Sequence, residues 1–309
     1  MNSNYRYSLV FPITTKKALV GSGYLVLGLF GVCLNLSTLS ILPECEQSLG
    51  RPLLIFFSIQ LFIAIGTLIF VAIPVPCMIA TNRPYIMNPL LSGAPGLLIC
   101  FTLVASFVLQ FCICMYRSVR IVFNRTTQCL FPDVVMQIII GVAFLLSVHI
   151  SVTITQSTNV RRFSLIHLNW QQSDHEYISL LTVVVYFSLA SLMFYALSIF
   201  HLLYEHIYDK NQYKDSTIAM KTQLLCLICD IIFATLLMLP RIDEPSKYPN
   251  LTILHSILNI IGAALWPTAY IIMYSKKVRT ELCFRTFLMC SACSRNKNTP
   301  SQNNRIRVV

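Results

Sequence analysis

Seven long apolar runs follow one another along the 309-residue chain, with short polar segments between them. Each run approaches or exceeds the roughly 20 residues that a helix needs to cross the hydrocarbon core of a bilayer. Apolar positions are continuous and do not alternate with a period of two, so they predict helices and not the strands of a barrel. The runs cover residues 18–42, 53–80, 95–116, 134–154, 177–204, 222–240 and 251–274.

Composition agrees with this pattern, because 56% of the residues are hydrophobic and only 11% are charged. A soluble domain usually has about 25% charged residues. We therefore expect an all-α membrane protein, a seven-transmembrane helix bundle over residues 18–274. Residues 1–17 form a tail before it, and residues 275–309 a short amphipathic eighth helix with a basic tail. The first run exceeds the apolar core of a signal peptide, about 7–15 residues, so it should stay as the first span.

The distribution of Lys and Arg predicts the orientation. Fifteen of the 23 basic residues fall in the segments on the same side as the C-terminus. Since cytoplasmic loops carry the excess of positive charge, the N-terminus should lie outside a plasma membrane and the C-terminus in the cytoplasm. The residues next to the first run favour the opposite, because Arg6, Lys16 and Lys17 precede it and only Arg51 follows closely.

The net charge of +11 points to lipid and not to nucleic acid as the partner. Basic residues are spread over the loops, and the densest group, from Lys276 to Arg285, directly follows the last run. Such a cluster faces anionic lipid headgroups. Cys290 and Cys293 come next and are candidates for acylation at the membrane surface.

Motifs for catalysis or for cofactors are missing from the sequence. No P-loop, dinucleotide fingerprint, nucleophile elbow or zinc-protease helix is present. Cys226 and Cys229 have metal-like spacing but lie in an apolar run, and the six histidines are scattered. We therefore expect no enzyme, no cofactor and no metal site.

Polar residues inside the runs are the informative positions, because each is costly in lipid and tends to face the bundle interior. They are Asn35, Gln60, Ser106, Gln110, Asp230 and Asn259. Interhelical hydrogen bonds would explain most of them without a further role. Asp230 differs, since it is the one acidic or basic residue in the seven runs. It should be either protonated or paired across the bundle, and we assign it a candidate switching role.

Several short motifs resemble those of rhodopsin-like G protein-coupled receptors. Gly31-Val-Cys-Leu-Asn35 is similar to the motif of the first helix, and Ser58-Ile-Gln-Leu61 to that of the second. Tyr116-Arg117-Ser118 closes the third run like a degenerate Asp-Arg-Tyr motif. In the last run, Trp266-Pro267-Thr-Ala-Tyr270 resembles the Asn-Pro-x-x-Tyr motif. Among these receptors the chain looks most like the nematode serpentine chemosensory receptors.

The resemblance implies a receptor that couples an extracellular small ligand to a cytoplasmic heterotrimeric G protein. Tyr116, Arg117 and Tyr270 would mediate the coupling, and the proline matching Pro267 would kink the last helix. A ligand would lie among the outer halves of the third, fifth, sixth and seventh helices, where the candidate pocket residues are Ile99, Leu103, Tyr186 and His255. No acid stands in the third run, which disfavours an amine ligand.

The sequence departs from the family in two places. The second outer loop, residues 156–175, contains no cysteine, so the usual disulfide to the third helix cannot form, and pairing of Cys77 with Cys100 stays open. Gln60 and Trp266 replace groups that help hold a sodium ion in the family.

Two other functions stay open. A seven-span ligand-gated cation channel of inverted topology would suit the charges around the first run. A transporter would predict inverted internal repeats, and none is visible. Asn250-Leu-Thr252 in the last outer loop is a glycosylation candidate, whereas Asn124-Arg-Thr126 has the same pattern on the cytoplasmic side.

Overall fold

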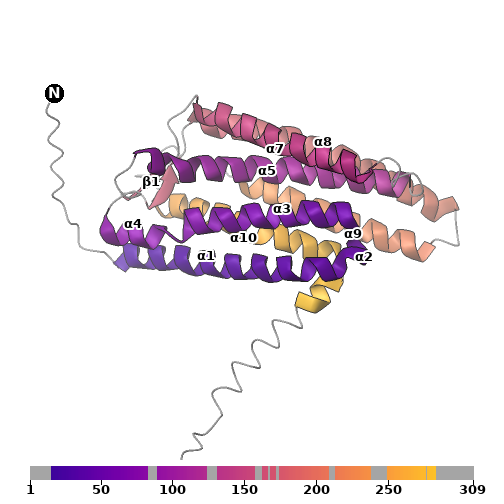
Figure 1. Ribbon diagram of the computed structural model, residues 1–309, viewed down its shortest axis with the longest axis horizontal. Helices are drawn as coiled ribbons and strands as arrows, with labels where there is room; N and C mark the ends of the chain where they lie inside the picture. The colour runs from indigo at the N-terminus through magenta and orange to yellow at the C-terminus, as the bar shows by residue number, and fades with distance from the viewer. Residues whose placement is uncertain are drawn as a thin grey trace, which may run out of the picture.

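The computed structural model describes residues 15–82, 89–123, 131–156, 162–165, 168–171, 174–208, 213–237, 249–275 and 277–282. These residues are almost entirely helical, and the long helices lie side by side in one bundle (Figure 1). The long helices are α1 (Thr15–Ile41), α3 (Arg51–Thr67), α5 (Pro89–Val122), α7 (Asp133–Gln156), α8 (Asp174–Tyr208), α9 (Tyr213–Leu237) and α10 (Pro249–Tyr274). The short elements are η1 (Leu42–Cys45), α2 (Glu46–Leu49), η2 (Leu68–Ala72), α4 (Val75–Thr81), β1 (Arg162–Ser164) and β2 (Asn169–Gln171).

Within the described residues, six helical stretches are long and apolar enough to cross a membrane. They overlap the first six predicted runs and comprise Lys17–Cys45, Arg51–Thr81, Ala94–Val122, Val134–Gln156, Glu176–Tyr204 and Ile218–Thr235. The seventh run forms α10, which has 26 residues. These six stretches are candidate membrane-spanning helices and suggest a multi-pass membrane protein, and the crossing of the bilayer by α10 stays a prediction.

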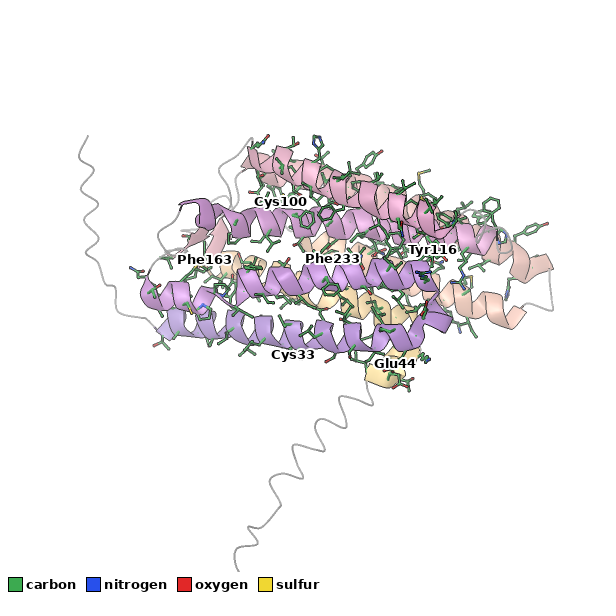
Figure 2. All side chains as sticks on the ribbon, in the orientation of Figure 1. Cys33, Glu44, Cys100, Tyr116, Phe163 and Phe233 are labelled. Carbon is green, nitrogen blue, oxygen red and sulfur yellow. The ribbon has the colours of Figure 1, made fainter. Side chains whose placement is uncertain are left out.

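The outer surface of the bundle is apolar at the depth of these helices. Phe62 on α3, Leu145 on α7, and Met193 and Phe200 on α8 are all more than 60% exposed. Figure 2 shows such side chains projecting from α7 and α8. Soluble proteins rarely expose apolar patches of this extent, so this surface suits hydrocarbon and not water.

Helix α5 occupies the centre of the bundle and is the most buried of the six stretches. It packs against α3, α7 and α8, while α8 and α10 both pack against α9 (Figure 1). Side chains of α5 therefore meet several helices that are distant in sequence, and this places its polar residues where a site between helices can form.

A short hairpin lies at the end of the bundle where α5 begins. Strands β1 and β2 pair antiparallel, with Phe163 opposite Trp170. Phe163 is buried and its ring meets that of Tyr24 edge-on, with centroids 6.1 Å apart. Strand β1 contacts α5 and β2 contacts α10, so the described part of the hairpin covers this end of the bundle.

The chain after α10 continues with a short helical stretch at residues 277–282. Val278 and Leu282, four residues apart, are buried against the bundle, while Arg279 between them is exposed. Lys277 Nζ donates a hydrogen bond to the Glu44 carbonyl at 2.6 Å. This stretch falls within the predicted amphipathic eighth helix, which itself stays a prediction, and Cys290 and Cys293 lie outside the described residues.

The second span is interrupted by a π-helical turn that the apolar pattern did not reveal. This turn, η2, follows α3 directly, and Pro74 and Pro76 come just after it. Here α1 approaches closely: a Cβ on Gly28 would lie 2.9 Å from Ala72 Cβ and 3.3 Å from Ile73 Cγ1. The sequence reading had counted only Asn35 and its neighbours as special in α1.

We expect Gly28→Ala to destabilise the bundle, because the added methyl group overpacks the contact between α1 and η2. Overpacking typically costs about 1–3 kcal/mol. Thermal unfolding in detergent should show a midpoint several degrees lower than that of the native chain. Gly23→Ala is the matched control on the same helix, since its Cβ would meet nothing within 4 Å. Equal midpoints for the two variants would contradict the close approach.

Candidate functional site

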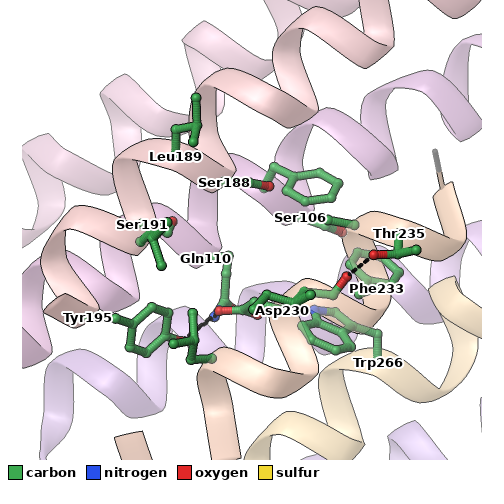
Figure 3. Close-up of a pocket in the computed structure, with 15 residues that line it drawn as sticks. Ser106, Gln110, Ser188, Leu189, Ser191, Tyr195, Asp230, Phe233, Thr235 and Trp266 are labelled. Atoms are coloured by element: carbon green, nitrogen blue, oxygen red, sulfur yellow. Dashed lines mark hydrogen bonds between the residues drawn. The ribbon is translucent and has the colours of Figure 1, made fainter. Parts of the chain in front are cut away.

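A cavity of about 180 Å³ lies between α5, α8, α9 and α10. Its lining is mainly apolar, with a polar edge formed by Gln110, Tyr195 and Asp230 (Figure 3). The remaining lining residues are Ser106 and Phe107 of α5, Ser188, Leu189, Ser191 and Leu192 of α8, Leu227, Ile231, Phe233, Ala234 and Thr235 of α9, and Trp266 of α10. This combination of an apolar wall with a few convergent polar groups is typical of small-molecule sites.

Three stacked aromatic rings form one wall of the cavity. The Phe233 ring lies almost parallel to the Trp266 ring, with centroids 4.5 Å apart. It also stacks on the Phe107 ring, with centroids 5.5 Å apart. Gly262 makes room for this stack, because a Cβ there would lie 2.9 Å from Phe233 Cε2. The wall thus joins α5, α9 and α10, and any guest in the cavity touches the side chains that hold these helices together.

Asp230 lies at the polar edge and is hydrogen-bonded to two other helices. Its Oδ2 accepts from the Tyr195 hydroxyl of α8 at 2.6 Å and from Gln110 Nε2 of α5 at 2.9 Å. The carboxyl is thus hydrogen-bonded across the bundle, and whether it is protonated stays a prediction. Hydrogen bonds to a carboxylate are stronger than those between neutral groups, especially in an apolar interior.

The hydrogen bonds continue from Asp230 to the residues of the predicted coupling motif. The Tyr195 and Tyr270 hydroxyls are 2.9 Å apart, and Arg117 Nη1 donates to the Tyr270 hydroxyl at 3.2 Å. Arg117 is only 5% exposed. Gln110 and Arg117 are seven residues apart on α5, about 10 Å along the helix axis. We call Gln110, Asp230, Tyr195, Tyr270 and Arg117 the polar chain.

A second polar cluster joins α1 to α10. Thr268 Oγ1 donates to Asn35 Oδ1 at 2.9 Å and lies 3.1 Å from the Thr38 hydroxyl. Pro267, next to Thr268, is buried inside α10, which continues as a helix to Tyr274. Gln60 of α3 is 3% exposed, and neither end of its amide has a hydrogen-bond partner among the described residues.

The cavity does not lie where the sequence placed the ligand pocket. Of the residues named for that pocket, Ile99 and Leu103 are buried earlier in α5, Tyr186 is 70% exposed on α8, and the side chain of His255 lies outside the described part. The first three are not among the residues that line this cavity. Ser106, Asp230 and Trp266 do line it, so the cavity lies further along α5 than Ile99 and Leu103.

Tyr195 is the member of the polar chain that the sequence did not predict. A tyrosine in an apolar run does not by itself distinguish a buried position from one that faces lipid. Ser191, Tyr195 and Ser198 are spaced by four and three residues, which places them on one face of α8. All three are buried, and Ser198 lies 2.7 Å from Ser118 of α5. This polar stripe was a signal that could have been found.

Other predicted positions are spread over the bundle. Tyr116 is buried with its ring edge-on to Phe131, 5.2 Å away, and is not a member of the polar chain. Arg120 donates from Nη1 to the Leu49 carbonyl at 3.1 Å. Cys77 is an exposed free thiol and therefore does not pair with Cys100. Asn250 is the second residue of α10, with its side chain outside the described part.

Comparison of the chain with protein-family models gives no match, and neither does comparison with the curated proteins. Among the described residues, no three histidine, cysteine, aspartate or glutamate side chains come together as a metal site.

Proposed function

We propose that the chain is a G protein-coupled receptor of the serpentine chemosensory kind, in which the cavity holds a small ligand and Arg117 lies at the G-protein end. The observation that supports the proposal is the continuous polar chain from Asp230 at the cavity to the buried Arg117. The residues at its inner end, Arg117 and Tyr270, are those that the motif resemblance assigns to coupling.

The proposed mechanism needs two arrangements of the bundle with different affinities for the ligand, because a ligand that binds both equally shifts nothing. Four helices contribute to the polar chain, and the aromatic wall links three of them. A guest that moves Asp230 or the Phe233 ring therefore changes hydrogen bonds shared by α5, α8, α9 and α10. Shifts of helices at such interfaces are a common way to switch between states.

Topology is the first test, since a receptor requires the N-terminus outside and the C-terminus inside. We expect a tag on the N-terminus to be stained in intact cells, and one on the C-terminus only after permeabilisation. Asn250 should then face the lumen during synthesis, so Asn250→Gln should remove any glycosidase-sensitive mass shift. Asn124→Gln is the matched control and should leave that shift unchanged. An N-terminal tag hidden in intact cells would favour the inverted channel and end the receptor proposal.

Coupling is tested directly with the purified chain in lipid nanodiscs. Nucleotide exchange by a panel of heterotrimeric G proteins should be faster with the chain than with empty nanodiscs for at least one member. Receptors catalyse this exchange at a basal level without ligand when their signalling state is partly populated. If no member of the panel responds, with or without the small alcohols discussed below, the chain is not a receptor of this class.

A further inference from the structure

The polar edge of the cavity contains acceptor atoms that have no donor among the described residues. Asp230 Oδ2 takes both hydrogen bonds, while Asp230 Oδ1 and Gln110 Oε1 are buried without a partner. The Gln110 NH₂ group donates to the carboxyl, so the amide oxygen is the end of the side chain that is left unpaired. Buried polar atoms are nearly always hydrogen-bonded in native proteins. Because Asp230 and Gln110 both line the cavity, their unpaired oxygens point to a donor that is missing from it.

The outer wall of the same cavity faces the surrounding medium of the bundle. Leu189 and Leu192 of α8 and Ile231 of α9 line the cavity and are also 57%, 43% and 53% exposed. These residues lie within two of the candidate membrane-spanning stretches, so the medium outside this wall is the hydrocarbon of the bilayer. The end of the bundle, in contrast, is covered by the hairpin whose Phe163 and Leu168 are buried. Access between α8 and α9 therefore leads from the bilayer.

We propose that the cavity binds a small, neutral, lipid-soluble alcohol, taken from the bilayer between α8 and α9, whose hydroxyl donates to Asp230 or Gln110. That the alcohol acts as a signal rests on the proposed receptor function, whereas its binding to the cavity does not. A charged amine also carries donors, but an ionised group in the hydrocarbon core is costly. An alkane would leave the two acceptors unpaired.

The volume limits the size of the alcohol. An apolar cavity of about 150 Å³ takes one benzene molecule, so about 180 Å³ suits an alcohol of roughly six to eight heavy atoms. The lining suits an alkyl chain, because most of its surface comes from Leu, Ile, Phe and Trp side chains, and the two unpaired acceptors belong to Gln110 and Asp230. Hexanol has a suitable length, with the hydroxyl at Asp230 and the alkyl chain along Phe233.

Trp266 provides a probe inside the cavity, because the chain has two tryptophans and the other, Trp170, is in β2. In a Trp170→Phe background in nanodiscs, 6-bromo-1-hexanol should quench Trp266 fluorescence on binding. The concentration in the bilayer that gives half-maximal quenching should be at least about tenfold higher for 1-bromohexane and for 6-bromohexylammonium. The first lacks the hydrogen-bond donor, and the second carries a charge. Retention of radiolabelled 1-hexanol by the unmodified chain repeats the measurement without any substitution.

Substitutions at two positions separate a specific site from a merely apolar one. Asp230→Asn keeps an oxygen for Tyr195 and Gln110 and puts an NH₂ group at the Oδ1 position. The new NH₂ group should favour a ligand that accepts a hydrogen bond. The affinity for 6-bromo-2-hexanone relative to that for 6-bromo-1-hexanol should therefore be higher in this variant than in the native chain. Ala234→Leu fills the cavity and should weaken every probe by a similar factor, and Ala234→Phe should weaken them further.

The outcomes decide the proposal. Equal binding of bromoalcohol and bromoalkane, stronger binding of the ammonium probe, or quenching unaffected by Ala234→Leu would each overturn it. Binding of the alcohol as expected, without any effect on nucleotide exchange, would support the site and contradict the receptor function instead.

Discussion

Replacing Arg117 by alanine is expected to reduce G-protein activation strongly at normal surface expression. The guanidinium is buried and donates to the Tyr270 hydroxyl, which in turn lies against Tyr195. A hydrogen bond from a charged group contributes roughly 1.5–3 kcal/mol, and each 1.4 kcal/mol is about tenfold in an equilibrium. Nucleotide exchange should therefore fall by a factor of about 10 to 100. Arg117→Lys should recover little, because an ammonium cannot reproduce the planar set of donors.

Arg120 is the matched control for this prediction. It has the same charge, is three residues further along α5, and donates to the Leu49 carbonyl instead of the polar chain. If Arg117 acts only as a positive charge that orients the chain in the membrane, both alanine variants should weaken exchange alike. If it acts through Tyr270, Arg120→Ala should retain most of the activity. Similar losses from the two variants at matched surface levels would leave Arg117 as a topological charge.

The helices were predictable because the bilayer imposes a simple requirement on the sequence. Every backbone group must be hydrogen-bonded within the segment, so long uncharged runs can only be helices. The first six runs are accordingly found in helices of the right length. The π turn η2 was not predictable in this way, since all its residues, Leu68–Ala72, are apolar and the hydrophobic pattern is the same in an α-helix.

The site was only partly predictable, for a related reason. Asp230 was recognised because a lone acid in hydrocarbon is rare, and the structure gives it partners on two helices. Which of the apolar and aromatic residues face each other depends on the rotation of each helix about its axis. Tyr186 and Tyr195 illustrate this, because nine residues at 100° each put them on opposite faces of α8. The sequence reading selected Tyr186, which faces outwards, and passed over Tyr195.

We expect Tyr195→Phe to disconnect the cavity from Arg117 while leaving the helix in place. The ring stays buried, but the hydroxyl that joins Asp230 Oδ2 to Tyr270 is removed. Asp230 keeps the hydrogen bond from Gln110, so binding of a small alcohol should change much less than activation. Nucleotide exchange should fall roughly tenfold or more, from the loss of hydrogen bonds in an apolar interior. Tyr186→Phe on the same helix should change neither, because that side chain is 70% exposed on the outer face.

A double variant tests whether the two residues act through one connection. If Tyr195 and Arg117 act through the same polar chain, one substitution already interrupts it, and the second should cause little further loss of nucleotide exchange. Tyr195→Phe combined with Arg117→Ala should then reduce exchange no further than Arg117→Ala alone, although independent effects would multiply. The measurement is the exchange rate of the native chain, the two single variants and the double variant at equal receptor concentration. Multiplying losses would show that Tyr195 and Arg117 influence activation separately, and the polar chain would have to be abandoned as the path from the cavity to the G protein.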